Sequence, residues 1–465
     1  MKFLFIYAPL QKLELGPKKN IFTQKGGRAP PLGILYLGKV LENKGYDVEV
    51  LDLQCEKMSD EQLEEKIRSA DLVGMTIYSG PSLDTTMKLG KKIKELDPNL
   101  PLVIGGPHLC FSPESVLQAH NADICVIREA EHIIIPLVEA IEGKRKLSSV
   151  HGIYYKENNE IKKNKPAEQI NDLDSLPFPA RHLVEKYQYG YVLGTKFAKG
   201  KTTSIVTSRG CAYGCRFCAL HYVVPGFRKR SIENIKLEID EIIDEGYKTL
   251  IFHDDNFLQN KKEAMQMMDY IIEKDADLQL WIEQARVDSA NRELYKKMRD
   301  AGVDTIYFGI ESGNQDVLDY YNKKITIEQI KKAVKLSREM GFITSGSFIF
   351  GAPIETKEHL ENTRKFVNSL SLDAAYFYPF NYLFGSPIWY DAVNEGKLKP
   401  DELCIVPDKR RNLGNFTDEW LLKYVDKAYK KFYFNPKFWA RHFFRAFTKG
   451  DYRLLKLGFD VLSPP

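Results

Sequence analysis

The densest group of cysteines in the chain lies in the segment Thr207-Ser208-Arg209-Gly210-Cys211-Ala212-Tyr213-Gly214-Cys215-Arg216-Phe217-Cys218. Three of the seven cysteines are here, separated by three residues and then by two. Three thiolates on one tight loop can hold three corners of a cubic iron–sulfur cluster, which leaves the fourth iron open to a small molecule. The spacing therefore predicts that Cys211, Cys215 and Cys218 bind a [4Fe-4S] cluster.

A zinc site is the alternative for the same cysteines. A structural zinc ion takes four ligands at short spacing, and only His221 lies near enough in sequence to complete the set. Three cysteines at this spacing after a strand favour the cluster over zinc or inert thiols. The other cysteines are scattered, and in the reducing cytosol we expect them to be ordinary thiols: Cys55, Cys110, Cys125 and Cys404.

The cysteine segment opens a regular alternation of apolar runs and helical patterns. Strand candidates are residues 203–207, 249–253, 279–283, 305–310, 344–350 and 374–378. Amphipathic helical patterns fill the gaps between them. Six βα repeats predict a partial (β/α)6 barrel of the TIM type over residues 196–388, with the working residues on loops after the strands.

The first 145 residues show a second α/β pattern, with strand candidates at 3–7, 47–51, 72–77, 102–105 and 124–127. We predict a Rossmann-like, doubly wound parallel sheet, in which ligands bind at the carboxyl ends of strands. Glycine-bearing turns stand at two such ends, around Ser79-Gly80 and at Gly105-Gly106-Pro107-His108. The polar residues 146–195 are expected to be a linker, and residues 389–465 a helical region.

Length and composition limit the class of protein. At about 150 residues per domain, 465 residues suggest about three domains, and 43% apolar residues exclude global disorder. The formal net charge of +4 gives no reason to expect nucleic acid as a partner. The apolar start is too short for a signal peptide or a membrane span, so we expect a cytoplasmic protein.

The C-terminal residues 430–457 interleave basic and aromatic side chains on predicted helices. One face of these helices could cover the barrel, and this is the favoured interpretation. The same face could instead make a peripheral membrane contact, because amphipathic periodicity alone does not separate the two.

The cysteine motif resembles that of the radical S-adenosylmethionine (SAM) superfamily. That resemblance implies a SAM molecule chelated to the open iron and its cleavage to a 5′-deoxyadenosyl radical. It is supported by further matches at strand ends, residues 253–257, 285–288, 309–313 and 350–355. Phe217 is similar to the family's adenine-side residue. Glu311 and Ser312 would then face the ribose or the ammonium of SAM, Arg286 its carboxylate, and the backbone of 309–313 would approach it closely. Asp255 is a further candidate contact, with bonding to loop amides as the alternative for it and for Asp254.

The first 145 residues resemble the cobalamin-binding domain of the cobalamin-dependent radical SAM subfamily. The matching stretches are residues 29–37, 48–52, 104–108 and 128–131. The resemblance implies cobalamin contacts at Gly33, Ser79, Gly105, Gly106, Pro107 and His108. The chain has no Asp-x-His-x-x-Gly segment, so a cobalt without a lower-axial histidine is implied.

Together these resemblances imply an enzyme that methylates an unactivated carbon. Methylcobalamin, charged by one SAM, would give its methyl group to a substrate radical made with a second SAM. The alternative is a cyclase, oxidase or rearrangement enzyme acting on a lipid, tetrapyrrole or peptide. A non-catalytic corrinoid or iron–sulfur sensor is a third hypothesis, although no output module is evident. Expected partners are a small-molecule, lipid or peptide substrate and an electron donor such as a ferredoxin or flavodoxin.

Overall fold

The structure is a computed structural model that describes residues 1–9, 29–80, 82–120, 122–158 and 160–462. The chain forms two compact units, and the boundary along the chain lies between Tyr191 and Val192. We call them the first unit, with described residues 1–9 and 29–191, and the second unit, residues 192–462. Each unit is built on its own sheet, and the two sheets are described separately below.

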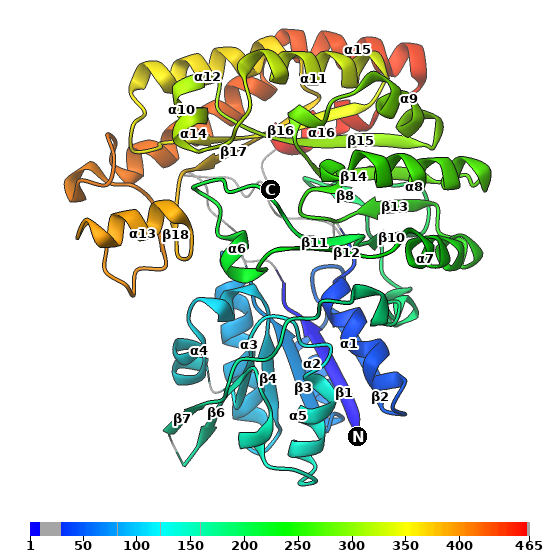
Figure 1. The fold of residues 1–465 in the computed structure, drawn as a ribbon, viewed down its shortest axis with the longest axis vertical. Coiled ribbons are helices and arrows are strands. Elements are labelled where there is room, and N and C mark those ends of the chain that lie inside the picture. Colours follow the sequence, from blue (N-terminus) through cyan, green and yellow to red (C-terminus); the bar gives the residue numbers. More distant parts are fainter. Residues whose placement is uncertain (10–28, 81, 121, 159, 463–465) are drawn as a thin grey trace. The chain divides into compact units, whose positions relative to one another are not determined.

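The first unit has a seven-stranded sheet in the order β2-β1-β3-β4-β5-β6-β7. Its strands are β1 (Lys2–Tyr7), β2 (Asp47–Asp52), β3 (Leu72–Thr76), β4 (Leu102–Gly105), β5 (Ile124–Val126), β6 (Ile153–Glu157) and β7 (Glu160–Lys163). Its helices are α1 (Leu32–Glu42), α2 (Asp60–Arg68), α3 (Leu83–Leu96), α4 (Pro113–His120) and α5 (Ile134–Ile141). The strands from β1 to β5 are parallel, as the near-continuous apolar runs predict. Helices cover both faces of the sheet (Figure 1).

The stretch 146–195 differs from the expected linker. β6 pairs antiparallel with β5, and β7 pairs antiparallel with β6, so both extend the first sheet. Ile153 and Tyr155 point into the core, while most of β7 is polar and at least partly exposed. A strand with one buried and one wet face carries few apolar residues, and its Lys-rich sequence is for that reason easily taken for a linker.

The second unit contains a parallel six-stranded sheet in the order β10-β13-β14-β15-β16-β17. Its strands are β10 (Thr202–Ile205), β13 (Thr249–Phe252), β14 (Gln279–Ala285), β15 (Val303–Glu311), β16 (Ile343–Phe350) and β17 (Ala374–Pro379). The helices between them are α7 (Ile232–Asp244), α8 (Lys261–Glu273), α9 (Arg292–Asp300), α10 (Gln315–Tyr320), α11 (Ile327–Glu339) and α12 (Lys357–Leu370). The strand order confirms the predicted partial barrel, with β10 and β17 as its two edges.

Short elements complete the second unit. They are β8 (Tyr191–Val192) at its junction with the first unit, β9 (Thr195–Lys196), β11 (Ser208–Gly210), α6 (Leu220–Val223), β12 (Phe227–Lys229), β18 (Tyr382–Leu383), α13 (Pro387–Asn394) and β19 (Cys404–Ile405). Three longer helices form the predicted helical end: α14 (Asp418–Tyr433), α15 (Pro436–Lys449) and α16 (Arg453–Leu462). Within the described residues, no helix combines the length and the apolar character needed to cross a membrane.

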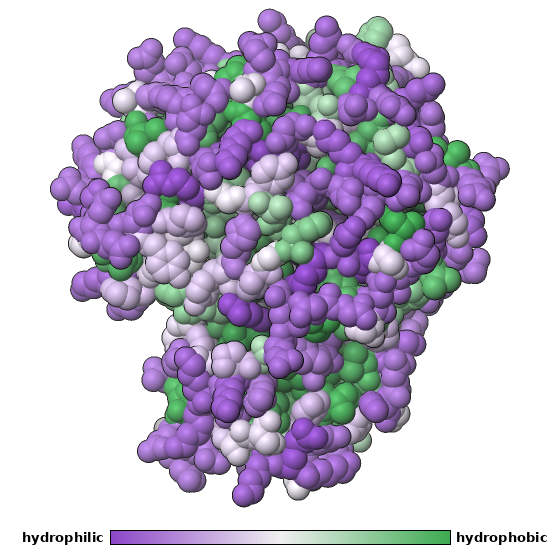
Figure 2. Space-filling model, viewed as in Figure 1, coloured by the Kyte–Doolittle hydropathy of each residue, from purple (hydrophilic) through white to green (hydrophobic). Residues whose placement is uncertain are grey.

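The helix α14 covers the exposed edge of β17. The amides of Phe377 and Ala375 donate to the hydroxyls of Tyr429 and Tyr433, at 3.1 and 3.4 Å. An uncovered edge strand would present unpaired backbone groups to other chains. α14 thus covers this edge of the barrel, while most of residues 430–457, for which the covering role is expected, lie on α15 and α16. Hydrophilic residues occupy most of the surface seen in Figure 2.

Candidate functional site

The three clustered cysteines lie on the loop between β11 and β12, beyond the carboxyl end of β10. Side chains and carbonyls from neighbouring loops hold this loop in place. The amide of Gly210 donates to Asp255 at 2.8 Å, and the amide of Ala212 donates to Gln259 at 2.9 Å. On the other side, the amide of Arg216 donates to the carbonyl of Tyr321 at 2.9 Å. The loop is thus fixed by the segments that follow β13 and β15.

The cysteines are free thiols of intermediate exposure. Burial raises the pKa of Cys218 to about 11, and burial also raises that of Cys211. The thiolate form therefore needs a positive partner, which a metal ion supplies when it binds. Leu220 donates its amide to the sulfur of Cys218 at 3.4 Å, and such a bond stabilises a thiolate ligand.

No group of three or more His, Cys, Asp and Glu side chains in the described part of the chain is arranged to hold a metal ion directly. His221, the residue considered as a fourth zinc ligand, has its Nε2 2.8 Å from the carbonyl oxygen of Tyr213. That nitrogen donates to the carbonyl and is not turned towards the thiols. The donor set, three thiols on one loop and no fourth side chain, fits a cluster held at three corners.

Arg286 lies beside the cysteine loop and is almost completely buried. Its guanidinium stacks on the ring of Tyr213 at 3.7 Å and approaches the sulfur of Cys215 with Nη1 at 3.9 Å. Nη2 donates to Asp288 at 2.9 Å and to the carbonyl of Lys323 at 2.6 Å. Most of its N–H groups are thus already used, and the predicted pairing with the SAM carboxylate stays a prediction.

Glu311 and Lys323 form a buried ion pair, with 2.7 Å between Oε1 and Nζ. Ser347 donates to the other carboxylate oxygen of Glu311 at 3.3 Å. Glu311 has a φ of +70°, at a register shift between β15 and β16, and this turns its side chain back over the strand. A Cβ on Gly309 would lie 2.6 Å from the Glu311 carboxylate and 3.0 Å from Lys323 Nζ, so glycine at 309 makes room for the pair.

Other predicted SAM contacts are engaged inside the second unit. The hydroxyl of the buried Ser312 lies 3.3 Å from that of Thr363 on α12. Asp254 accepts from Thr207 and Ser208, and Asp255 accepts from Gly210, as the structural alternative for both predicts. Gly313 packs against α12 as well, since a Cβ there would be 2.8 Å from Phe366. Close approach of the 309–313 backbone to SAM therefore has little support at either glycine.

Phe217 packs edge to face on the buried ring of Tyr321, with 5.0 Å between the ring centres. Lys323 Nζ lies 5.8 Å from the centre of the Phe217 ring. No sequence pattern indicates a role for Lys323 or Tyr321. Both lie in a short segment after α10 that is rich in Tyr, Asn and Lys, and nothing in that composition separates a buried lysine from a solvated one.

In the first unit, the predicted cobalamin contacts gather at the carboxyl edge of the parallel strands. Ser79 follows β3, and its hydroxyl lies 3.0 Å from Nδ1 of His108, which follows β4 after Pro107. Gly106 has a φ of +111°, and a Cβ there would be 2.6 Å from the carbonyl of Ile77, so the turn requires glycine.

Room for a ligand exists at the same edge. An added Cβ at Gly105, or at Gly33 in the first turn of α1, would meet no described atom within 4 Å. The order β2-β1-β3 places the reversal of the sheet between β1 and β3, the usual ligand position in such folds. The arrangement fits a large planar cofactor, and the individual contacts remain predictions.

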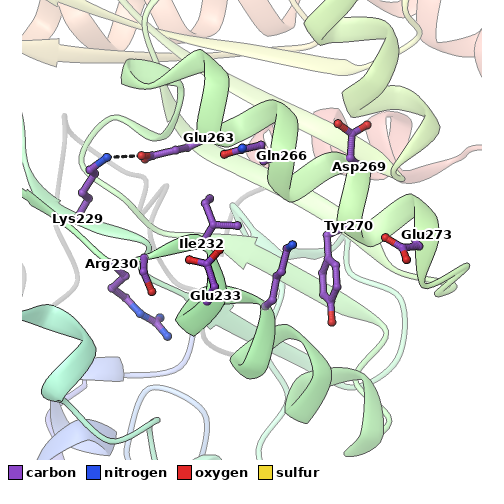
Figure 3. A pocket seen from close by; sticks show the side chains of 11 residues that line it. Lys229, Arg230, Ile232, Glu233, Glu263, Gln266, Asp269, Tyr270 and Glu273 are labelled. Atoms are coloured by element: carbon purple, nitrogen blue, oxygen red, sulfur yellow. Dashed lines mark hydrogen bonds and ion pairs between the residues drawn. The ribbon is translucent and has the colours of Figure 1, made fainter.

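The second unit also has a surface hollow of about 640 Å³ between α7 and α8 (Figure 3). Its lining mixes both signs of charge: Lys229, Arg230 and Lys236 with Glu233, Glu263, Asp269 and Glu273. Lys229 is paired with Glu263 across it. None of the predicted site residues lines this hollow.

The fold and the cysteine loop define an iron–sulfur enzyme that carries a second, cofactor-binding sheet. Residues 205–367 match the family model of the radical SAM superfamily, and residues 19–137 match that of the B12 binding domain. The chain belongs to the cobalamin-dependent radical SAM enzymes, whose cofactors are a [4Fe-4S] cluster, SAM and cobalamin.

Particular relatives are an uncharacterized methyltransferase of Pyrococcus horikoshii and a cyclase. The first is 32% identical to this chain, and the match covers 94% of both proteins. The second, the anaerobic magnesium-protoporphyrin IX monomethyl ester cyclase of Cereibacter sphaeroides, is 31% identical over 77% of this chain and 60% of its own. Among solved structures, the cobalamin-dependent radical enzyme OxsB has a similar fold, with a TM-score of 0.70, 18% identity, and coverage of 98% of this chain and 72% of its own.

Proposed function

We propose that this enzyme methylates an unactivated carbon atom, with SAM as the source of the methyl group. The observation that carries the proposal is a three-cysteine loop fixed at the barrel edge, in a chain that also has a B12-binding sheet. A relative that matches along nearly the whole length is named a methyltransferase. An unactivated carbon has no proton acidic enough for a side-chain base, so polar methyl transfer would fail there.

In this proposal Cys211, Cys215 and Cys218 hold the cluster, which supplies the electron that cleaves the SAM sulfonium. Asp255 fixes the start of the loop through the amide of Gly210. Arg286 keeps a positive charge beside Cys215, and this charge would favour the reduced state of the cluster. Phe217, on the edge of Tyr321, offers an apolar surface for the adenine.

The Glu311–Lys323 pair sets the charge near Phe217, whose ring centre lies 5.8 Å from Lys323 Nζ. Both side chains are less than a tenth exposed, at 7% and 8%, and the two charges cancel. A neutral, rigid pair would accept a hydrogen bond from a hydroxyl of the SAM ribose through the Glu311 oxygen that Ser347 contacts, without attracting bulk water. Ser312 would act through Thr363 and α12, since its hydroxyl lies on that side.

Gly33, Ser79, Gly105, Gly106, Pro107 and His108 would hold cobalamin, which supplies a carrier for the methyl group. Ser79 orients the ring of His108 through Nδ1. Gly33 and Gly105 leave open space at the strand edge, so a planar macrocycle could lie directly on the backbone there. We further propose a small-molecule, lipid or peptide substrate, an electron donor such as a ferredoxin or flavodoxin, and a cytoplasmic location.

The test counts products after anaerobic reconstitution with iron, sulfide and hydroxocobalamin. The enzyme is given SAM with a trideuterated methyl group and a chemical reductant, and mass spectrometry follows the label. We expect S-adenosylhomocysteine, 5′-deoxyadenosine and labelled corrinoid. The Cys215→Ala variant should form no 5′-deoxyadenosine, because that product needs the electron of the cluster, while Cys404→Ala, which changes an exposed thiol outside the loop, should form all three products.

The cyclase relative favours a second candidate function, a ring-forming or oxidative reaction without methyl transfer. The same experiment separates the two. Formation of 5′-deoxyadenosine without S-adenosylhomocysteine and without labelled corrinoid would reject methylation and leave the cyclase class.

A further inference from the structure

The helices α15 and α16 expose an unusual number of large aromatic side chains. Phe447 is 88% exposed, Phe444 71%, Tyr452 63%, Phe459 56% and Phe443 46%. We call these five residues the aromatic face. Single exposed apolar residues are common on proteins, but a contiguous group of this kind marks a contact surface.

Rings of the aromatic face on the two helices are linked through a shared anchor. Phe447 is four residues after Phe443 and three after Phe444, so these three rings share the outward side of α15. Trp439 joins the two helices, with ring centres 6.1 Å from Phe443 and 4.7 Å from Phe459. Its indole nitrogen donates to the carbonyl of Tyr433 at 2.8 Å. A Cβ on Gly458 would lie 2.9 Å from the Trp439 ring, so α16 packs tightly on this anchor.

The core of the second unit does not use these outward rings. The inward side of α15 already supplies Phe438, His442 and Ala446, which are buried. Figure 1 shows α15 along the outer margin of the second unit. The outward aromatic residues therefore do not contribute to the packing of the barrel.

Charge limits the kind of partner that fits this face. α15 contains Lys437, Arg441, Arg445 and Lys449 and no acidic residue. Burial and three nearby arginines lower the pKa of His442 to about 3, so it stays neutral and adds no charge of either sign. On α16 and the turn before it, Asp451 is bound to Arg445 and Arg453, at 3.0 and 2.8 Å.

The exposed rim of the aromatic face is therefore basic, through Lys437 on α15 and Lys456 on α16. Asp460, the remaining acidic residue on α16, accepts from the hydroxyl of Thr195. A second copy of this face, related by a two-fold axis, would bring lysine against lysine and is disfavoured. The partner has to be negatively charged at its surface and apolar just beneath it.

We propose that α15 and α16 bind the surface of an anionic lipid bilayer. Phe443, Phe444 and Phe447 insert between the headgroups, and Lys437 and Lys456 contact lipid phosphates. Aromatic rings prefer this boundary because it offers an apolar layer beside a polar one. The inference goes beyond the proposed reaction and does not depend on it, since binding to vesicles requires no turnover.

The test is co-sedimentation of the reconstituted full-length enzyme with vesicles. One set contains phosphatidylcholine alone, and the other contains phosphatidylcholine with about a third phosphatidylglycerol. We expect binding to the anionic set at low salt and much weaker binding at high salt, because mobile ions screen the lysines. Neutral vesicles should bind at least tenfold more weakly.

Two pairs of variants separate the aromatic from the basic contribution. Phe444→Gln with Phe447→Gln should weaken anionic binding about 100-fold, since two buried rings are lost. Its control is Leu237→Gln with Ile272→Gln, which removes exposed apolar side chains from α7 and α8. Lys437→Gln with Lys456→Gln should weaken binding about 25-fold at low salt. Its control, Lys262→Gln with Lys296→Gln, changes exposed lysines of α8 and α9. Both controls should bind as the unchanged enzyme does.

Circular dichroism and thermal melting show whether each variant folds, and the lysine pair tests the proposal separately if the phenylalanine pair does not. Equal binding to neutral and anionic vesicles would overturn the proposal, as would wild-type affinity in both the phenylalanine variant and the lysine variant. Self-association that the phenylalanine variant abolishes, without vesicle binding by the unchanged enzyme, would assign the face to a protein contact and also overturn it.

Discussion

Replacing Glu311 by glutamine tests the buried ion pair at the centre of the second unit. The change keeps the size of the side chain and removes only its charge. Lys323 then has no carboxylate at 2.7 Å, although it is only 8% exposed. Burial alone lowers the pKa of Lys323, but the charge and hydrogen bond of Glu311, together with the nearby Cys215, raise it above the usual value of 10.5. Without Glu311, the effect of burial is only partly offset.

The expected loss of stability follows from two limits. Removing one partner of a buried pair costs about 3–5 kcal/mol when the other charge stays in place. Lys323 can instead lose its proton. Neutralising a lysine with a pKa of 10.5 at pH 7 costs about 1.4 kcal/mol per unit, or about 5 kcal/mol in all. Both limits place the loss at about 3–5 kcal/mol at pH 7. The loss of stability should shrink as pH rises, because deprotonating the unpaired lysine costs less free energy at higher pH.

Tryptophan fluorescence during denaturant unfolding reports this unit, since all four tryptophans lie in it: Trp281, Trp389, Trp420 and Trp439. The control is Glu328→Gln, which breaks an exposed pair with Lys331 at the same 2.7 Å distance and should cost under about 0.5 kcal/mol. The double variant Glu311→Gln with Lys323→Met should recover most of the loss. A cost below about 1 kcal/mol for Glu311→Gln, or no recovery in the double variant, would refute this account of the pair.

Three more predictions concern the same unit. Arg286→Gln should lower the reduction potential of the cluster by tens of millivolts, because a positive charge near Cys215 is lost, while Arg286→Lys should lower it less. An electron paramagnetic resonance titration measures the potential, and equal potentials in the variants and the unchanged enzyme would exclude the effect. Cys218→Ala should abolish the cluster absorption and most bound iron, and an unchanged iron content would contradict the ligand assignment. Burial raises the pKa of Glu355 from 4.5 to about 7, so the folded state keeps a proton that the unfolded state releases in this window. Stability should therefore fall by about 3 kcal/mol as pH rises from 4.5 to 7, and Glu355→Gln, whose amide oxygen can still accept from Gly351, should remove that slope in pH-dependent unfolding.

The parts of the fold that the sequence predicts are those with a strong local signal. The barrel strands are apolar on both faces, and the cysteine spacing is a local pattern, so both appear in the one-dimensional chain. The sequence of β6 and β7 predicts a linker, because the side of these strands that faces water carries polar residues. Domain limits at residues 145, 195 and 388 stay predictions, and β6 and β7 place at least residues 153–163 with the first sheet.

Partnerships between distant residues are harder to predict. Lys323 pairs with Glu311, and Arg286 reaches the carbonyl of Lys323, yet neither contact follows from spacing. Asp255 is predicted to contact SAM, and its carboxylate accepts a hydrogen bond from the amide of Gly210. Such contacts depend on how separate strand ends come together, which a pattern of apolar residues does not specify.

The tyrosine hydroxyls of α14 have a consequence for how this enzyme can be cut. The barrel sheet does not close on itself and has two open margins. Tyr429 and Tyr433 cover one of them, because their hydroxyls accept hydrogen bonds from the amides of Phe377 and Ala375. A fragment that stopped at residue 388 would contain every strand of the barrel sheet and every clustered cysteine, yet it would leave that margin uncovered and ready to pair with other chains. The smallest piece that could remain monomeric therefore runs on to at least residue 433.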